Sequence, residues 1–489
     1  MNKPLFTGPE WTFELLEKTW KVIDKIARET FGLEYYAPQI EIITSEQMLS
    51  NYSSHAMPIM YPHWSFGKNF LKNDEAYRKG FMGLAYEVVI NTDPCIAYLM
   101  ETNSMTMQAL VMAHASCGHS SFFKNNYLYK NWTEAKYIID YLKFARSYIK
   151  ECEYKYGEQE VESFLDKCHS IQYNSVDRYN KPRGLKKELQ KQRDRKWQEY
   201  TERMFNDVWR TVPERKEEIK ETQENKYNFP EDNLLYFLEK NSPVLSSWQK
   251  EICRIVRKIA QYFYPQMQEK LINEGWATFI HHIIMTEMHL QGHITDGSYL
   301  EFLDFHTTVV AQPNWTRKYY SGINIYALGF AMFQDIKRIC QFPTEEDKHW
   351  FPDICNTDWL TTCTDVMKNY RDESFVLQFL SPKVIRDFRL FTLHADSRYP
   401  YLQVDATHSD EDILRIRQTL AAFYDINQKI PRIEITEITE EGYLLLHHLS
   451  DNRLDYNSMK AVVMNIHEMW GDPVKMVYKN LKGEEVDDV

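Results

Sequence analysis

The sequence has 489 residues, 43% of them hydrophobic and 14% aromatic, which is enough apolar side chain to fill the cores of two or more domains. Its formal net charge of −12 argues against a general nucleic-acid binder, because such a protein presents a basic face. The 8 cysteines occur singly, the N-terminus has no secretory signal pattern, and no apolar run approaches the length of a membrane span. These features predict a cytoplasmic protein with reduced thiols and no membrane span.

The N-terminal part of the chain combines helical and strand patterns. Residues 11–31 carry apolar side chains at helical spacing and end before Gly32, which predicts a helix. The stretches 40–45 and 86–91 are rich in β-branched residues and predict two strands. After the second strand, the segment 95–117 is predicted to form a long helix.

Three stretches carry charge or aromatic side chains without a clear chemical motif. The aromatic stretch 61–70 is interpreted as a structured loop, in which His63 and Lys68 could line a pocket. The basic stretch 181–205 has a helical period, and we prefer a solvated helix face to a contact with an acidic partner. The segment 213–233 is charged and poor in apolar residues, so that 181–233 as a whole is predicted to be a charged, mobile segment.

The rest of the chain up to residue 390 has a helical pattern, with helices predicted within 133–170, 273–290 and 320–339. Beyond it, strand and helix patterns alternate in the stretches 388–395, 401–406, 409–424, 432–438, 443–449, 456–470 and 474–480. Without the first strand this order is β-α-β-β-α-β, the pattern of ferredoxin-like domains. We therefore predict an α+β fold that is mostly helical, with a core at 1–390 and a small C-terminal domain at 391–489.

Two separate segments carry the side chains of a candidate metal site. His114 and His119 lie five positions apart at the end of an apolar run. A second stretch contributes Glu274, His281 and His282; the first two are seven residues apart and so share one helix face, whereas the third fits this face less well. Neutral imidazole and carboxylate are the ligands that zinc and similar divalent ions take. The sequence therefore predicts a metal site between the two segments.

The spacing of His114 and His119 does not suit a regular helix. On an α-helix, residues five apart project about 140° from each other, so they could not bind one ion together. A π-bulge, or a helix that ends at Gly118 with His119 just beyond it, would bring them together, and the glycine makes the second route plausible. The alternative is that each histidine is an ordinary hydrogen-bonded core residue, because the motif alone is unspecific.

Other catalytic motifs are absent from the sequence. There is no dinucleotide-binding G-x-G-x-x-G, no P-loop and no G-x-S-x-G nucleophile motif. The single Glu-x-x-His, Glu346 to His349, lies in a charged stretch and does not support a di-iron bundle that uses two such motifs.

Long stretches of the sequence resemble the SpoVR family, the stage V sporulation protein R-like proteins of bacteria. They include PHWSFGK, YEVVINTDPCIAYLMETN, MAHASCGHSSFFKNN, NEGWATFIHH and YSGINIYALGFAMFQDIKRI. The resemblance implies a role in sporulation, through the spore cortex and cell wall, or in a stress response in bacteria that form no spores. It also implies a PrkA-like serine kinase as a partner in the same pathway.

The chain is also, more distantly, similar to zincin-type metallopeptidases. The metal ligands that this similarity implies are His114, His119, Glu274 and His281, the last as a fourth ligand or as an acid/base. Those enzymes carry a general-base glutamate directly after the first histidine, where this chain has Ala115. Glu87 or His281 would then have to act as the catalytic base.

The combined prediction is a metal-dependent hydrolase that acts on an amide bond of a peptide or of a cell-wall precursor. Zinc is the expected ion, with iron and manganese as alternatives. Two other functions stay open: a regulator or scaffold with a structural metal, which binds its partner through the C-terminal domain, and an iron enzyme that uses the His/carboxylate set. The sequence does not determine the substrate or the oligomeric state.

Overall fold

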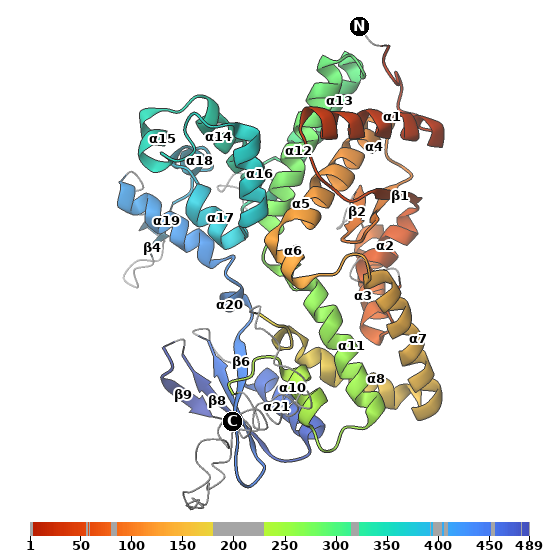
Figure 1. Cartoon of the computed structure of the whole chain (residues 1–489), viewed down its shortest axis with the longest axis vertical. Coiled ribbons are helices and arrows are strands. Elements are labelled where there is room, and N and C mark those ends of the chain that lie inside the picture. Colours follow the sequence, from red (N-terminus) through yellow and green to blue (C-terminus); the bar gives the residue numbers. More distant parts are fainter. Residues whose placement is uncertain are drawn as a thin grey trace, which may run out of the picture.

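The computed structural model describes most of the chain. The described residues are 3–54, 57, 59–79, 86–178, 229–313, 322–391, 393–394, 403–404, 409–450, 455–480 and 482–488. Within them the fold is α+β and mostly helical, with small sheets, as the sequence predicts (Figure 1). The basic stretch 181–205 and most of 213–233 lie outside the described residues. No helix in the described part is both long enough and apolar enough to cross a membrane.

The N-terminal helix forms as predicted. Helix α1 (Phe13–Lys25) is capped by the Thr12 side chain and continues into a π-helical turn, η1 (Ile26–Thr30). The chain then turns at Gly32, whose φ of 56° lies in the left-handed region that favours glycine.

A three-stranded sheet follows, in the order β1-β3-β2, formed by β1 (Pro38–Ile43), β2 (Glu87–Ile90) and β3 (Cys95–Met100). The first two strands were predicted, but the expectation of a helix from residue 95 is wrong at its start. The apolar run at 95–100 is a buried strand parallel to β1 and antiparallel to β2. Short apolar runs do not distinguish a buried strand from a buried helix. Helix α4 (Met105–Val111) begins only after Ser104, which caps it.

The aromatic stretch 61–70 was predicted to be a loop, but it is largely helical. It contains the start of helix α3 (Trp64–Arg78), which follows α2 (Ser45–Ser53). His63 is the N-cap residue of α3 and accepts a hydrogen bond from the Ser65 backbone N–H. Imidazole is a less usual cap than Ser, Thr, Asp or Asn, so the start of α3 carries no standard sequence signal.

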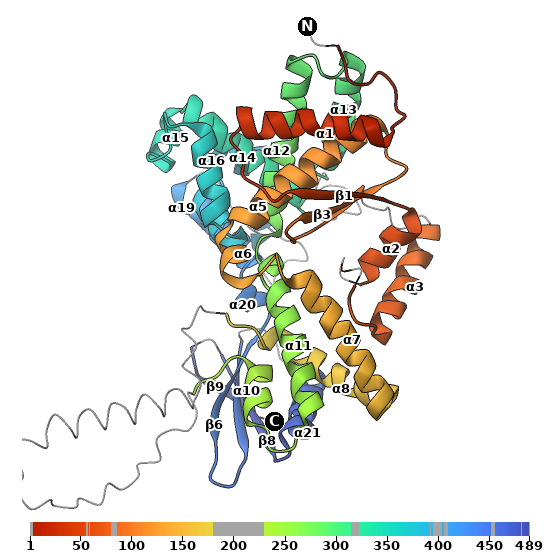
Figure 2. The ribbon, with the colours of Figure 1, turned by 45° about the vertical axis from the view of Figure 1, so that its right-hand side comes forward.

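Most of the remaining described chain is helical, including the helices predicted within 133–170, 273–290 and 320–339. The helices are α5 (Ser120–Asn125), α6 (Tyr127–Trp132), α7 (Ile138–Tyr156), α8 (Glu158–Ser170), η3 (Gln172–Asn174), α10 (Leu234–Asn241), α11 (Ser247–Phe263), η4 (Pro265–Met267), α12 (Lys270–Leu290), α13 (Asp296–Val309), α14 (Ile325–Gln341), α15 (Glu345–Trp350), α16 (Trp359–Asn369), α17 (Asp372–Phe379) and α18 (Pro382–Asp387). In both whole-chain views α12 runs between the N-terminal helices and the later helices α14, α16 and α17 (Figure 2).

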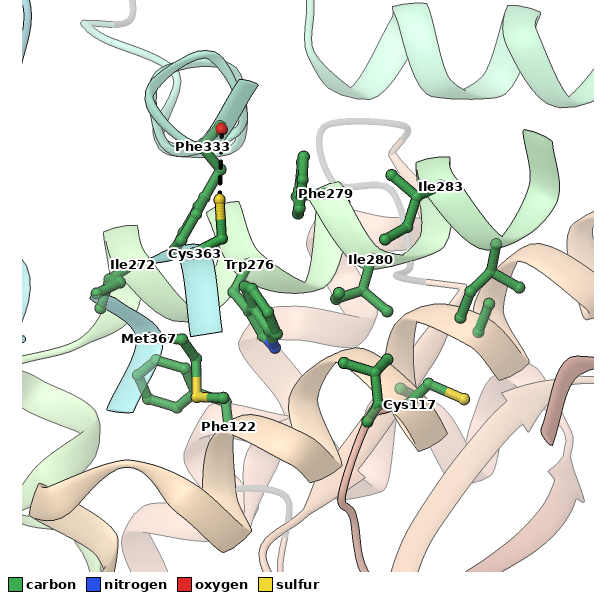
Figure 3. Close-up of a cluster of buried hydrophobic side chains, with 14 of the residues drawn as sticks. Cys117, Phe122, Ile272, Trp276, Phe279, Ile280, Ile283, Phe333, Cys363 and Met367 are labelled. Carbon is green, nitrogen blue, oxygen red and sulfur yellow. Dashed lines mark hydrogen bonds between the residues drawn. The ribbon is translucent and has the colours of Figure 1, made fainter. Parts of the chain in front are cut away.

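The core around α12 is tightly packed. Trp276, Phe279, Ile280 and Ile283 of α12 point toward side chains of the neighbouring helices, and all of them are buried (Figure 3). Glycines set the helix spacing at two contacts. A Cβ on Gly118 would lie 2.6 Å from Ala277 Cα, and a Cβ on Gly275 would lie 2.6 Å from Gly329 Cα. These glycines allow α12 to approach its two neighbours backbone to backbone.

The C-terminal part differs from the predicted ferredoxin-like arrangement. Its elements are β4 (Leu393–His394), β5 (Gln403–Val404), α19 (Asp410–Ala422), α20 (Ile426–Lys429), β6 (Arg432–Ile438), β7 (Leu444–Leu449), α21 (Tyr456–Trp470), β8 (Val474–Lys479) and β9 (Glu485–Asp488). The strand predicted at 401–406 corresponds to β5, which pairs with β4 in a separate sheet, while the four-stranded sheet has the order β6-β7-β8-β9. The ferredoxin-like arrangement is therefore not confirmed. The zincin-like character predicted for the N-terminal and central region is not confirmed either.

Hydrophobic contacts link the C-terminal elements to the rest of the chain. Ile413 and Leu420 of α19 belong to the same buried cluster as the α12 side chains. By contrast, Ile435 of β6 and Leu446 of β7 share a second cluster with Ile255 of α11. The domain boundary near residue 390 stays a prediction.

Candidate metal centre

An underwound helix brings the two predicted histidines together. Residues Met112–His119 form a π-helix, η2, which continues without a break into α5. In a π-helix the backbone bonds run from i to i+5, so residues five apart lie on successive turns of one face. The rings of His114 and His119 are 4.6 Å apart between centroids. The π-bulge considered from the sequence is thus confirmed, and the alternative of a helix ending at Gly118 is wrong.

Two carboxylates complete the candidate site. Glu274 Oε2 on α12 lies 3.4 Å from His119 Nε2 and 3.7 Å from His114 Nε2. Glu87 Oε1, from β2, lies 3.6 Å from His114 Nε2. One ligand atom each from His114, His119 and Glu274 lies within 4.8 Å of the others, the arrangement required to hold a single ion.

The imidazoles are oriented by hydrogen bonds at their far nitrogens. His119 Nδ1 lies 2.8 Å from Asn273 Oδ1, which can only accept, so this nitrogen carries a proton and Nε2 faces Glu274. His114 Nδ1 lies 2.9 Å from His281 Nδ1. Hydrogen bonds of this kind fix the tautomer of metal-binding histidines and point the free lone pair at the ion.

His281 lies beside the group formed by His114, His119 and Glu274 rather than within it. Its Nδ1 contacts His114 Nδ1, and its Nε2 lies 2.9 Å from His306 Nδ1. Burial, with further contributions from His114 and His306, lowers the pKa of His281 well below its usual value, and burial with His282 and His114 lowers the pKa of His306 to about 4. Neutral rings can form one directed chain, in which His114 donates to His281 and His281 donates to His306. The fourth-ligand role predicted for His281 gains no support from this arrangement.

The two carboxylates have opposite electrostatic environments. Burial would raise the pKa of Glu274, but His119 and His114 outweigh it and hold this pKa below its usual range. For Glu87 burial prevails over the attraction of His114 and His119, so its pKa is raised. Burial also lowers the pKa of His119, yet the Glu274 carboxylate outweighs it and raises this pKa to about 9. Without a metal ion, the protonated His119 ring supplies the positive charge that balances the Glu274 carboxylate. A bound cation would take over this role and displace the proton.

Three residues around the site were assigned no role from the sequence. Tyr326 of α14 lies near Glu274, and burial together with the charges of Glu274 and Glu87 raises the pKa of its phenol. Asn273 and His306 orient the imidazoles, as described above. Asn273 is the first residue of the predicted stretch 273–290, but the other two lie on other helices, and no spacing in the sequence relates them to it.

Comparisons with known proteins identify the relatives of this chain. The family described as SpoVR like protein matches residues 10–429. A protein of Escherichia coli strain K12 described as uncharacterized protein YcgB is 51% identical over 490 residues, covering 99% of this chain and 96% of the relative. No solved structure matches the chain.

Proposed function

The chain belongs to the SpoVR-like protein family, and from the geometry of its buried site we propose that it is a metal-dependent hydrolase of an amide or peptide-type bond. The observation that carries the proposal is the convergence of His114, His119 and Glu274, whose ligand atoms lie within 4.8 Å of one another. Glu87, a carboxylate with a raised pKa, lies beside them.

The residues fit a divalent ion. Two imidazoles present Nε2 to one ionised carboxylate in a buried environment, and a buried negative charge requires a cation or a proton as its partner. Zinc takes this ligand set, and iron and manganese are the alternatives. When bound, the ion would supply Lewis acidity to polarise a carbonyl group.

The remaining side chains account for proton movement and orientation. Glu87 takes the general-base role that Ala115 cannot fill, because a raised pKa makes its carboxylate a stronger proton acceptor than an ordinary glutamate. The Tyr326 hydroxyl is a donor placed next to Glu274, where it can stabilise negative charge that develops on a substrate oxygen. His281 and His306 hold His114 in the tautomer that leaves Nε2 free.

Family membership supports a biological setting for this activity. We place the protein in the cytoplasm, acting on a peptide or a cell-wall-type substrate during sporulation or a stress response. A PrkA-like kinase in the same pathway is part of this proposal.

The test combines metal analysis with a hydrolysis assay. Protein purified without added metal is analysed for zinc, iron and manganese, and it is then assayed for release of amino groups from peptides and from peptidoglycan fragments. We expect the variant with both His114→Ala and His119→Ala to lose the activity while His289→Ala, which alters a His–Asp pair outside the site, retains it. Equal hydrolysis by the double variant and by the wild type would refute the proposal.

A structural metal site is the second candidate, because the side chains of His114 and His119 are only 6% and 7% exposed. Closed sites contribute metal-binding energy to folding. The double variant would then lose several kcal/mol of stability, about the scale at which single-site losses are diagnostic. A catalytic site predicts a thermal midpoint close to that of the wild type.

A further inference from the structure

A second group of metal-type ligands lies outside the site described above, where the N-terminus of α3 meets α8. His63, Asp166 and His169 each offer one ligand atom, and these atoms all lie within 4.8 Å of one another. Asp166 and His169 are three residues apart on α8 and therefore share a face of that helix. In both whole-chain views α3 lies next to α2 and close to the α7–α8 pair (Figures 1 and 2).

Neighbouring groups hold all three ligand side chains in place. His63 Nε2 lies 3.2 Å from Asp166 Oδ1, and the rings of His63 and His169 are 4.6 Å apart between centroids. Trp64 Nε1 donates to both oxygens of Asp166, at 2.9 and 3.2 Å. The Tyr61 hydroxyl lies 2.6 Å from His169 Nε2. Such supporting hydrogen bonds are typical of metal ligands, because they fix ring and carboxylate orientation before the ion arrives.

The hydrogen bonds of His63 allow a proton and an ion to replace each other. Its Nδ1 lies 2.7 Å from Ser65 Oγ and 3.3 Å from the Ser65 backbone nitrogen. With the proton on Nε2, His63 donates to Asp166 and its Nδ1 caps α3. In the other tautomer the proton is on Nδ1 and is donated to Ser65 Oγ. The lone pair of Nε2 then faces the Asp166 carboxylate, and this arrangement requires a cation between Nε2 and the carboxylate.

The setting of the group suits a cation that joins two helices. The His63 side chain is 2% exposed and that of Asp166 is 48% exposed, so an ion can enter from the Asp166 side and keep a water ligand there. Helix α3 has no buried side chain of its own between Trp64 and Arg78. A helix without a buried apolar face gains little from the hydrophobic effect, and its attachment therefore depends on the polar contacts at its first turn.

We propose that His63, Asp166 and His169 form a second site, which binds a divalent transition-metal ion of the zinc class and fastens α3 to α8. Two imidazoles and one carboxylate with an open position for water match the ligand preferences and coordination number of zinc. The proposal is independent of the function assigned to the first site, because it uses other residues and other helices.

The test is a titration of the metal-free, full-length protein with zinc against a chromogenic chelator. We expect two ions per wild-type chain, and one ion in a variant with Asp166→Asn and His169→Gln, because the loss of two ligands should lower affinity by more than about 100-fold. Asparagine keeps an oxygen that can accept from Trp64, so this variant preserves the local packing. His289→Gln is the matched control, since His289 lies 2.8 Å from Asp296 in a His–Asp pair outside both groups, and it should still bind two ions.

Hydrogen exchange provides a second readout. Zinc should slow the exchange of backbone amides in α3 in the wild type and leave that exchange unchanged in the Asp166/His169 variant, while α1 is unaffected in both. A wild-type chain that binds a single ion lost only on substitution of His114 and His119 would overturn the proposal, and so would a variant that binds as many ions as the wild type. A single ion lost only in the Asp166/His169 variant would support this site and reject the first.

Discussion

Substitution of Gly118 by alanine should weaken the fold and the proposed metal site together. A Cβ at this position would lie 2.6 Å from Ala277 Cα, 2.8 Å from Ala277 Cβ and 3.2 Å from Ala277 O, none of which is the end of a flexible side chain. Ordinary carbon contacts are about 3.6 Å, so α12 would have to move by roughly 1 Å away from η2. Forced repacking of this kind costs about 1–3 kcal/mol. The measurement is the urea midpoint of unfolding of the metal-free protein.

The same displacement should reduce metal affinity, because Glu274 lies on the helix that must move and His119 lies on the one that stays. We expect affinity to fall by about 10- to 100-fold, the range found when the supports of metal ligands are disturbed. Gly67→Ala is the control: it also lies within a helix, α3, but its added Cβ meets nothing within 4 Å, and it should gain up to about 1 kcal/mol from helix propensity. A Gly118→Ala protein as stable as the wild type, with unchanged affinity, would show that the close approach of η2 and α12 does not set the site.

Three further predictions concern the chemistry of the site. Because the pKa of His119 is raised to about 9, above its ordinary 6.5, its protonated form stabilises the metal-free protein fully below pH 6.5, and this contribution is lost as the pH rises through about 9. Metal affinity should change in the opposite direction, increasing by about tenfold per pH unit over the same window, since the ion must displace that proton; a pH-independent affinity would contradict this. Glu87→Gln should lower kcat by about 10²- to 10⁴-fold without changing metal content, as steady-state assays with metal analysis would show; loss of the metal instead would make Glu87 a ligand. His281→Ala should lower metal affinity by about 10- to 100-fold in a chelator competition, and an unchanged affinity would reject its role in orienting His114.

The sequence alone identified both segments of the candidate site but left two conformations open for the backbone between His114 and His119. Glu274 and His281 were placed on one face of a helix because a seven-residue spacing returns to the same side, and α12 forms as expected. The sequence does not decide between a π-bulge and a helix end at His119, because a glycine such as Gly118 is also a common helix-stop signal. In the structure this glycine is needed for packing against Ala277, a contact between residues far apart in the chain that no local pattern reveals.

The second ligand group shows a different limit of sequence reasoning. His63 was predicted to lie in a loop, and the Asp-x-x-His spacing of Asp166 and His169 has no meaning until a third ligand is placed opposite it. The cap that His63 provides to α3 puts it there, and an imidazole cap has no standard sequence signature. Contacts that depend on how two helices meet are set by tertiary packing, which a single sequence does not display.

The π-helix explains why one short segment can contribute both to the proposed metal site and to the core. If residues 112–119 formed an α-helix, His114 and His119 would point about 140° apart, and only one of them could reach Glu274. Underwinding aligns the two histidines toward Glu274, while Gly118, between them in sequence, packs against Ala277 of the same helix α12. Both contacts are made to α12, so the position of that helix fixes the carboxylate and the backbone contact at once. Any change that restores regular α-helical winding here should therefore remove one ligand and the close packing in a single step.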